Sequence, residues 1–289
     1  MDRTRKLDLA LEARELAAEA GEVPGVCLEE ETVRGLSLTR VQIETEQGAQ
    51  TLGKPVGIYL TMELPALPRD REEILNTAEA VADLVGELVP SDGPALAVGL
   101  GNRRMTPDAL GPRTAEGMLV TRHLMEILPK AGLRPVSALS PGVTGTTGME
   151  SGELIAAAAG KLAPACVIAV DALAARRQER VCRTIQLSDA GIVPGSGVGN
   201  VRMALDRKTL GVPVIAVGVP TVVEAATLCL DLLDGDFDPS VFRREGAAWF
   251  VTPRNIDQEI ETLSRVLALG LSAGLQPNLS VKDVESWLA

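Results

Sequence analysis

Short apolar segments alternate with helix-forming segments from residue 95 onward, and this alternation limits the fold more than any other feature of the chain. The segments 95–100, 165–170 and 212–219 have the length and continuous hydrophobicity of strands buried on both faces. Strands that alternate with helices are typical of a sheet covered by helices on both faces. The sequence therefore predicts an α/β fold with a mixed or mostly parallel sheet.

Helices are predicted where apolar residues recur every three or four positions, or where Ala and Leu dominate. The predicted helices are 7–20, 69–88, 114–128, 150–162, 221–233, 256–271 and 281–288. The helix at 221 rests on Thr221-Val-Val-Glu224, which has the residues of a capping box. A short strand is predicted at 135–139. Apolar and polar residues roughly alternate in the segment 26–64, which predicts a smaller antiparallel β element near the N-terminus.

Composition excludes several classes of function. The net charge of −11 and the 2% of aromatic residues argue against a nucleic-acid-binding surface, which needs clustered basic side chains and stacking rings. The single histidine, His123, does not suffice for the multi-histidine sites of zinc hydrolases. It falls inside the predicted helix 114–128, where a surface or packing role is expected. We therefore expect no direct nucleic-acid partner.

The cysteines and the hydropathy pattern bear on location. Four widely spaced cysteines and a charged N-terminus without an apolar signal segment favour a reduced, cytoplasmic protein. The most apolar stretch, 212–233, is interrupted by two prolines and two acidic residues, so no membrane-spanning helix is expected. The four cysteines, for which we expect structural roles, are Cys27, Cys166, Cys182 and Cys229.

Polar segments follow the predicted strands at the sheet edge where ligands gather in doubly wound folds. Asp171 directly follows the strand 165–170, where partial desolvation raises the pKa of a carboxyl group. Its alternative role is to cap a loop or a helix start. Asp108 lies in Thr106-Pro-Asp108, a helix-start pattern in which an acid also compensates the helix dipole.

A glycine-rich loop, Gly195–Gly199, offers a second kind of site. Such loops cradle phosphates when a Lys-Ser/Thr pair follows and a strand leads into them, and both features are missing here. A flexible loop is the better interpretation. A non-enzymatic nucleotide-binding module stays open as an alternative function.

Seven motifs, taken in order, resemble the germination protease family (spore endopeptidases) of spore-forming bacteria. The resemblance extends from about residue 7 to about residue 233. The motifs are Gly99-Leu-Gly-Asn102, Thr106-Pro-Asp-Ala-Leu-Gly-Pro112, Ser140-Pro-Gly-Val-Thr-Gly-Thr-Thr-Gly148, Val170-Asp-Ala-Leu-Ala174, Thr184-Ile-Gln-Leu-Ser-Asp189, Pro194-Gly-Ser-Gly-Val-Gly-Asn200 and Val217-Gly-Val-Pro-Thr-Val-Val223.

The resemblance implies an endopeptidase that degrades small acid-soluble spore proteins during germination. It also implies a fold like that of the hydrogenase-maturation peptidases, a homotetramer, and a location in the cytoplasm of the forespore and the spore core. The family's two proposed catalytic aspartates carry over to Asp108 and Asp171, and Asp189 is a candidate assisting acid. Two facing carboxyl groups share a proton near neutral pH, which suits water activation without histidine, metal or cofactor.

The family is made as a zymogen that removes its own N-terminal segment, and its substrates are cut after an acidic residue in segments like Glu-Ile-Ala-x-Glu. Asp8-Leu9-Ala10-Leu11-Glu12 is similar. We predict autocleavage between Asp8 and Leu9, with 1–8 as propeptide and 9–289 as a single α/β peptidase domain. An ordinary helix start is the alternative for this segment. A metal-dependent, maturation-type peptidase that uses the same two aspartates as ligands is the alternative mechanism.

Overall fold

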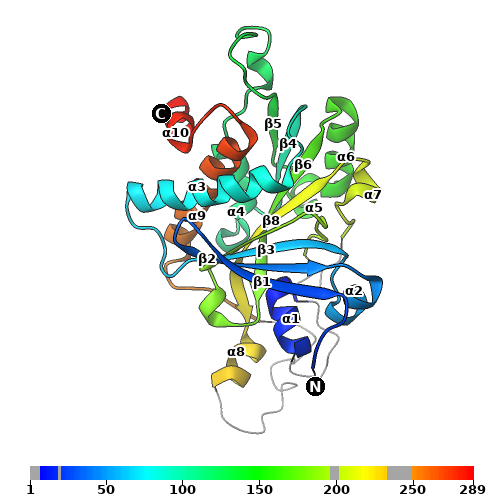
Figure 1. Cartoon of the computed structure of the whole chain (residues 1–289). Coiled ribbons are helices and arrows are strands. Elements are labelled where there is room, and N and C mark those ends of the chain that lie inside the picture. Colours follow the sequence, from blue (N-terminus) through cyan, green and yellow to red (C-terminus); the bar gives the residue numbers. More distant parts are fainter. Residues whose placement is uncertain (1–6, 19–20, 196–201, 233–248) are drawn as a thin grey trace.

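The computed structural model describes residues 7–18, 21–195, 202–232 and 249–289 of the 289-residue chain. Its strands form one sheet in the order β1-β2-β3-β7-β8-β6-β4-β5, with β9 paired to β8. The strands are β1 (Val26–Val33), β2 (Leu36–Ile43), β3 (Gly57–Glu63), β4 (Ala95–Gly99), β5 (Val136–Leu139), β6 (Cys166–Ala175), β7 (Thr184–Ser188), β8 (Val214–Glu224) and β9 (Phe250–Val251) (Figure 1).

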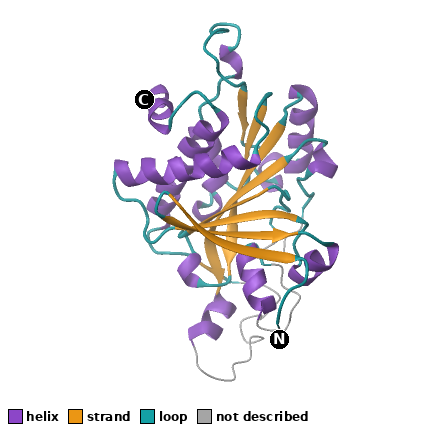
Figure 2. Ribbon diagram, viewed as in Figure 1, coloured by secondary structure: helices purple, strands orange, loops and turns teal. Residues whose placement is uncertain are grey.

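Helices cover both faces of this sheet (Figure 2). They are α1 (Ala10–Ala18), α2 (Glu46–Leu52), α3 (Arg71–Leu88), α4 (Leu110–Gly117), α5 (Thr144–Thr147), α6 (Ser151–Leu162), α7 (Arg207–Leu210), α8 (Ala225–Leu232), α9 (Ile256–Leu275) and α10 (Val281–Leu288). Short 3₁₀ helices span Thr106–Asp108, Arg122–Leu124 and Gln178–Arg180.

The sheet is mixed, as predicted. Strands β5, β4, β6 and β8 run parallel, and β7, β3, β2 and β1 continue the sheet in antiparallel pairs. The predicted antiparallel element is therefore joined to the parallel part rather than separate from it. The joining strand, β7, was missed because its five residues include Thr184, Gln186 and Ser188, which break the apolar run that marked the other buried strands.

Alternate residues of the central strands pack into two separate apolar layers, as the two-residue period of a strand requires. Ala95 and Ala97 of β4 face the larger layer under α3, α4 and α9, whereas Leu96 and Val98 face a smaller layer with Ile155 of α6. The long helices α3 and α9 lie against each other on the first face (Figure 1). Close packing on both faces holds β4 and β6 rigidly in the parallel part of the sheet.

Two predicted helices have wrong bounds. The predicted helix 114–128 is helical only to Gly117: α4 begins earlier, at Leu110, and ends at Gly117, after which Met118 is extended and the Leu119 N–H donates to Ser272 Oγ at 2.9 Å. His123 accordingly lies in a short 3₁₀ helix instead of mid-helix, and it is exposed.

The capping box predicted at Thr221 is also wrong. Residues 221–224 continue β8, where Val222 and Val223 pair with β6 and Val223 also pairs with β9. β-branched side chains favour a strand over a helix start in such a position. The helix α8 begins only at Ala225.

The remaining predicted helices and strands are found with small shifts at their ends, and α10 has the predicted bounds. One shift changes the site: the strand predicted at 165–170 continues to Ala175. Asp171 therefore lies within β6 rather than just beyond its end. In the described part of the chain, no helix is long and apolar enough to cross a membrane.

Candidate active site

Asp171 is held in the parallel part of the sheet. Its strand, β6, pairs with β4 on one side and β8 on the other, with Val170 opposite Gly99 and Asp171 opposite Gly218. Only 6% of the Asp171 surface is exposed. Its Oδ1 accepts a hydrogen bond from the Ala172 N–H at 2.9 Å. The backbone on both sides fixes this carboxyl group, so it has little freedom to move toward solvent.

Asp108 reaches the same region from the loop that follows β4. Its Oδ2 accepts a hydrogen bond from the Asn102 N–H at 2.7 Å, which closes the loop on itself. Gly101 has a φ of +111°, and a Cβ added there would collide with the Asp108 carbonyl, so the turn requires glycine. The Leu100 N–H donates to the Val170 carbonyl at 2.8 Å, which ties the start of this loop to β6.

Asp108 is close enough to Asp171 for its charge to affect the ionisation of Asp171. Burial raises the pKa of Asp171 well above its usual range, and the charges of Asp108 and Asp8 raise that pKa further. Burial also raises the pKa of Asp108, while the Asn102 N–H lowers it. The positive charge of Arg202 opposes both increases. Because Asp171 is the more deeply buried, it holds a proton more readily than Asp108.

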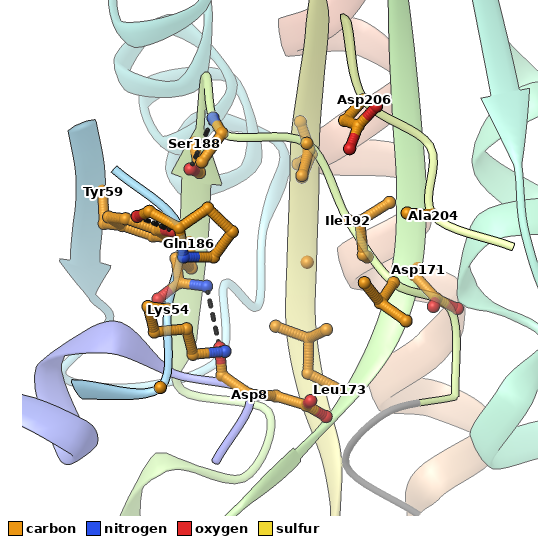
Figure 3. Close-up of a pocket in the computed structure, with 18 of the residues that line it drawn as sticks. Asp8, Lys54, Tyr59, Asp171, Leu173, Gln186, Ser188, Ile192, Ala204 and Asp206 are labelled. Atoms are coloured by element: carbon orange, nitrogen blue, oxygen red, sulfur yellow. Dashed lines mark hydrogen bonds between the residues drawn. The ribbon is translucent and has the colours of Figure 1, made fainter. Parts of the chain in front are cut away.

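A cavity of about 400 Å³ opens beside Asp171 (Figure 3). Its walls come from β6, β7, β8, the turn after α2 and the segment after β7. Labelled side chains that line it include Asp8, Lys54, Tyr59, Gln186 and Asp206. The volume is within the range of small-ligand pockets, and a short stretch of extended peptide fits such a space.

The N-terminal segment enters this cavity, and Asp8 lies in it. Asp8 Oδ2 accepts a hydrogen bond from the Ala174 N–H at 2.9 Å. Ala174 follows a bulge in the pairing of β6 with β8, and bulges are common beside active sites. The next residue, Leu9, is fully buried. Asp8, the residue before the predicted cleavage point, therefore lines the cavity and contacts β6, the strand that carries Asp171.

The residues after Asp8 are also anchored. The Glu12 carboxylate is 1% exposed and accepts hydrogen bonds from the Arg176 and Arg177 N–H groups at 2.8 and 3.0 Å. The Arg180 guanidinium lies 3.5 Å from Glu12 and 2.6 Å from Glu15. Burial still raises the pKa of Glu12 despite these partners. Helix α1 is thus fixed to the loop that follows β6.

Asp189 occupies a different position from the other two predicted acids. Its side chain is exposed, and its Oδ1 accepts a hydrogen bond from the Ile58 N–H at 2.7 Å. Its own N–H donates to the Ile58 carbonyl at 3.3 Å. These contacts extend the pairing of β3 with β7 next to the cavity, because Ser188 and Ala190 line it. Its assisting role stays a prediction.

The alternative functions require residues beyond the two aspartates. In the described ranges, no group of three His, Cys, Asp or Glu side chains is placed to hold a metal ion. His123 is exposed on its 3₁₀ helix between α4 and β5. Of the glycine-rich loop, residues 196–199 lie outside the described residues. Cys166 and Cys182 are buried, and burial raises the pKa of both thiols, which agrees with structural roles.

Sequence reasoning missed Lys54 and Gln186, which contact the Asp8 main chain. Lys54 Nζ and Gln186 Nε2 donate to the Asp8 carbonyl at 2.8 and 3.3 Å. In the sequence, Lys54 stands between Gly53 and Pro55 within the predicted β segment 26–64, and Gln186 is one residue of the motif Thr184–Asp189. Neither residue type at these positions signals a site until the fold places it beside Asp8.

Comparison with known proteins shows the family of this chain. A family model described as Germination protease matches residues 4–238. The germination protease of Clostridium tetani is 40% identical over 98% of this chain and 99% of the relative. That of Caldanaerobacter subterraneus is 42% identical over 98% of each. A [NiFe] hydrogenase maturation protease, HycI from Thermococcus kodakarensis, aligns with a TM-score of 0.38 and 17% identity, covering 65% of this chain and 98% of that one.

The germination protease family model and relatives define this protein, a mixed α/β sheet with a cavity beside a buried carboxyl group, as a peptidase. More narrowly, the chain belongs to the germination protease family. It is therefore a hydrolase of the kind that acts in spore germination.

Proposed function

We propose that this chain is an endopeptidase that starts the degradation of small acid-soluble spore proteins in the cytoplasm of the forespore and spore core. In this proposal it is a homotetramer, made as a zymogen that cuts itself between Asp8 and Leu9, so that 1–8 is a propeptide and 9–289 the peptidase domain. Asp108 and Asp171 form the catalytic pair. The observation that carries the proposal is the position of Asp8 in the cavity beside Asp171.

The chemistry follows from the two carboxyl groups. Asp171, the deeper one, holds the shared proton, and Asp108 is ionised. The ionised carboxylate accepts a proton from a water molecule as its oxygen attacks the carbonyl carbon of Asp8. A proton then passes from the pair to the Leu9 nitrogen, and the bond between that nitrogen and the carbonyl carbon breaks. The products are a new carboxylate on Asp8 and a new amine on Leu9.

The two apparent pKa values belong to the pair, because interacting carboxyl groups titrate together. Burial of Asp171 and the hydrogen bond from Asn102 to Asp108 both support the assignment of the proton to Asp171. An increase in pH that ionises both groups removes the acid that protonates the leaving nitrogen. Activity is therefore expected to fall as pH rises through the raised pKa of the pair.

The test is a cleavage assay with Asp108→Asn and Asp171→Asn in the full chain. Both variants are expected to leave the N-terminal segment uncut and to leave a purified small acid-soluble spore protein intact, while the wild-type chain cuts both. Intact-mass spectrometry locates the cut, which is expected between Asp8 and Leu9. Wild-type activity in either variant, or a mature chain that starts far from Leu9, contradicts the proposal.

A further inference from the structure

The main-chain carbonyl of Asp8 is held by two side chains from different parts of the sheet. Lys54 Nζ donates to it at 2.8 Å, and Gln186 Nε2 donates at 3.3 Å (Figure 3). Lys54 follows Gly53, the left-handed residue that ends α2. Gln186 is the central residue of β7, between β3 and β8. Under the proposed function, this carbonyl belongs to the bond that is cut.

Gln186 contacts the chain on both sides of that bond. Its Oε1 accepts a hydrogen bond from the Ala10 N–H at 2.7 Å, while its Nε2 reaches the Asp8 carbonyl. Only 8% of Gln186 is exposed, and its strand is paired on both sides. Because the Gln186 amide binds one group on each side of the Asp8–Leu9 bond, it fixes the orientation of that bond. Such positioning lowers the barrier to attack by a bound water.

Lys54 adds positive charge at the oxygen that becomes negative. When water adds to the carbonyl carbon, its oxygen acquires a full negative charge, and a half-buried ammonium group 2.8 Å away stabilises that charge more than the neutral carbonyl. In Figure 3 the Asp8 side chain extends toward Leu173, on the side of the cavity where Asp171 lies. Gln186 and Lys54 approach the Asp8 main chain from the other side.

We propose that Lys54 and Gln186 form the carbonyl-binding site of this peptidase: both stabilise the negative oxygen at the cut, and Gln186 also binds the N–H of the second residue after it. This inference rests on the proposed function, because it takes the Asp8–Leu9 bond as a substrate of the site. It adds a substrate requirement: the second residue after the cut must carry a free main-chain N–H, so proline is excluded there.

The first test measures self-cleavage of the full chain. Lys54→Met and Gln186→Met are expected to slow the cut between Asp8 and Leu9 by about 10²- to 10³-fold each, the usual effect of removing one such donor. Lys54→Arg retains a positive donor and is expected to recover part of the rate. Lys161→Met on α6 and Gln258→Met on α9 change exposed residues of the same types and are expected to cut at the wild-type rate.

The second test gives peptides that span residues 1–18 to wild-type and variant chains that are produced with Leu9 as their first residue. In one peptide, lactic acid replaces Ala10, so an ester oxygen stands where the N–H was. The wild-type enzyme is expected to lose kcat/KM on this ester peptide. Gln186→Met is expected to lose less on the ester than on the amide peptide, because one of its two contacts is already missing. This comparison uses one folded variant against two peptides, so a change in stability affects both alike.

The outcomes separate the inference from the proposed function. Wild-type rates in Lys54→Met and Gln186→Met, alongside an inactive Asp171→Asn, overturn the inference and leave the proposed function standing. Equal losses of Gln186→Met on the two peptides overturn the contact to the Ala10 N–H. A wild-type chain that never cuts at Leu9 overturns both the inference and the proposed autocleavage.

Discussion

Replacing Asp171 by Asn is expected to remove activity. It is also expected to make the folded chain more stable than the chain with Asp171, by a difference that grows as pH rises. Asn has nearly the same shape and its Oδ1 still accepts the Ala172 N–H, so the change removes only the ability to ionise. Burial raises the pKa of Asp171 in the folded chain well above that of an unfolded aspartate, which is about 3.9. The folded state therefore binds this proton more tightly than the unfolded state.

The sign of the effect follows from proton linkage. At a pH below the unfolded pKa, Asp171 is protonated in both states, and Asp and Asn differ little. Between the unfolded and the folded pKa, unfolding releases the proton, so the wild-type side chain loses stability by up to about 1.4 kcal/mol per pH unit. Above the folded pKa the loss is constant. The advantage of Asn thus grows with pH across that window and then levels off, and its final size measures the pKa shift.

The measurement is urea unfolding at half-unit steps from pH 4 to pH 8. Asp108→Asn serves as the background, because self-cleavage would otherwise mix with unfolding, and burial, the largest cause of the shift, remains in that background. Asp283→Asn is the control of opposite sign: Ser280 lowers the pKa of Asp283, so this variant is expected to lose stability above the unfolded pKa and to match the parent in acid. Parallel curves for the parent and Asp171→Asn would refute a buried, protonated Asp171.

Three further outcomes are expected. Gly101→Ala forces a Cβ against the Asp108 carbonyl and is expected to lower kcat by 10-fold or more with little change in KM, whereas Gly86→Ala in α3, where the added Cβ meets open space, leaves both constants unchanged. Glu12→Ala removes the buried acceptor of the Arg176 and Arg177 N–H groups and is expected to destabilise the uncut chain by about 1–3 kcal/mol in urea unfolding, with stability equal to wild type as the contradicting result. A strong chelator such as EDTA is expected to leave cleavage unchanged; loss of activity that Ni²⁺ or Zn²⁺ restores would favour the metal-dependent alternative.

The sequence predicts the parts of the fold whose patterns are local. Runs such as 165–170 are apolar because both faces of β6 are covered, and the spacing of Ile74, Ala78 and Val81 in α3 follows from one buried face. The errors arise where tertiary contacts override local preference. Residues 221–224 match the capping-box pattern of a helix start, but pairing with β6 and β9 makes them a strand.

The candidate site also contains residues that the local sequence reveals and residues that only tertiary contacts reveal. Asp171 is conspicuous in the sequence because a charged residue follows a run of buried apolar ones, and that contrast is itself the physical cause of its raised pKa. Lys54 and Gln186 carry no such contrast, since lysine after a helix and glutamine in a mixed polar strand are ordinary. Their significance comes from the pairing of β3 with β7, which joins the N-terminal hairpin to the parallel sheet and sets Gln186 facing the Asp8 carbonyl. A site assembled by the pairing of strands more than a hundred residues apart is visible only once that pairing is known.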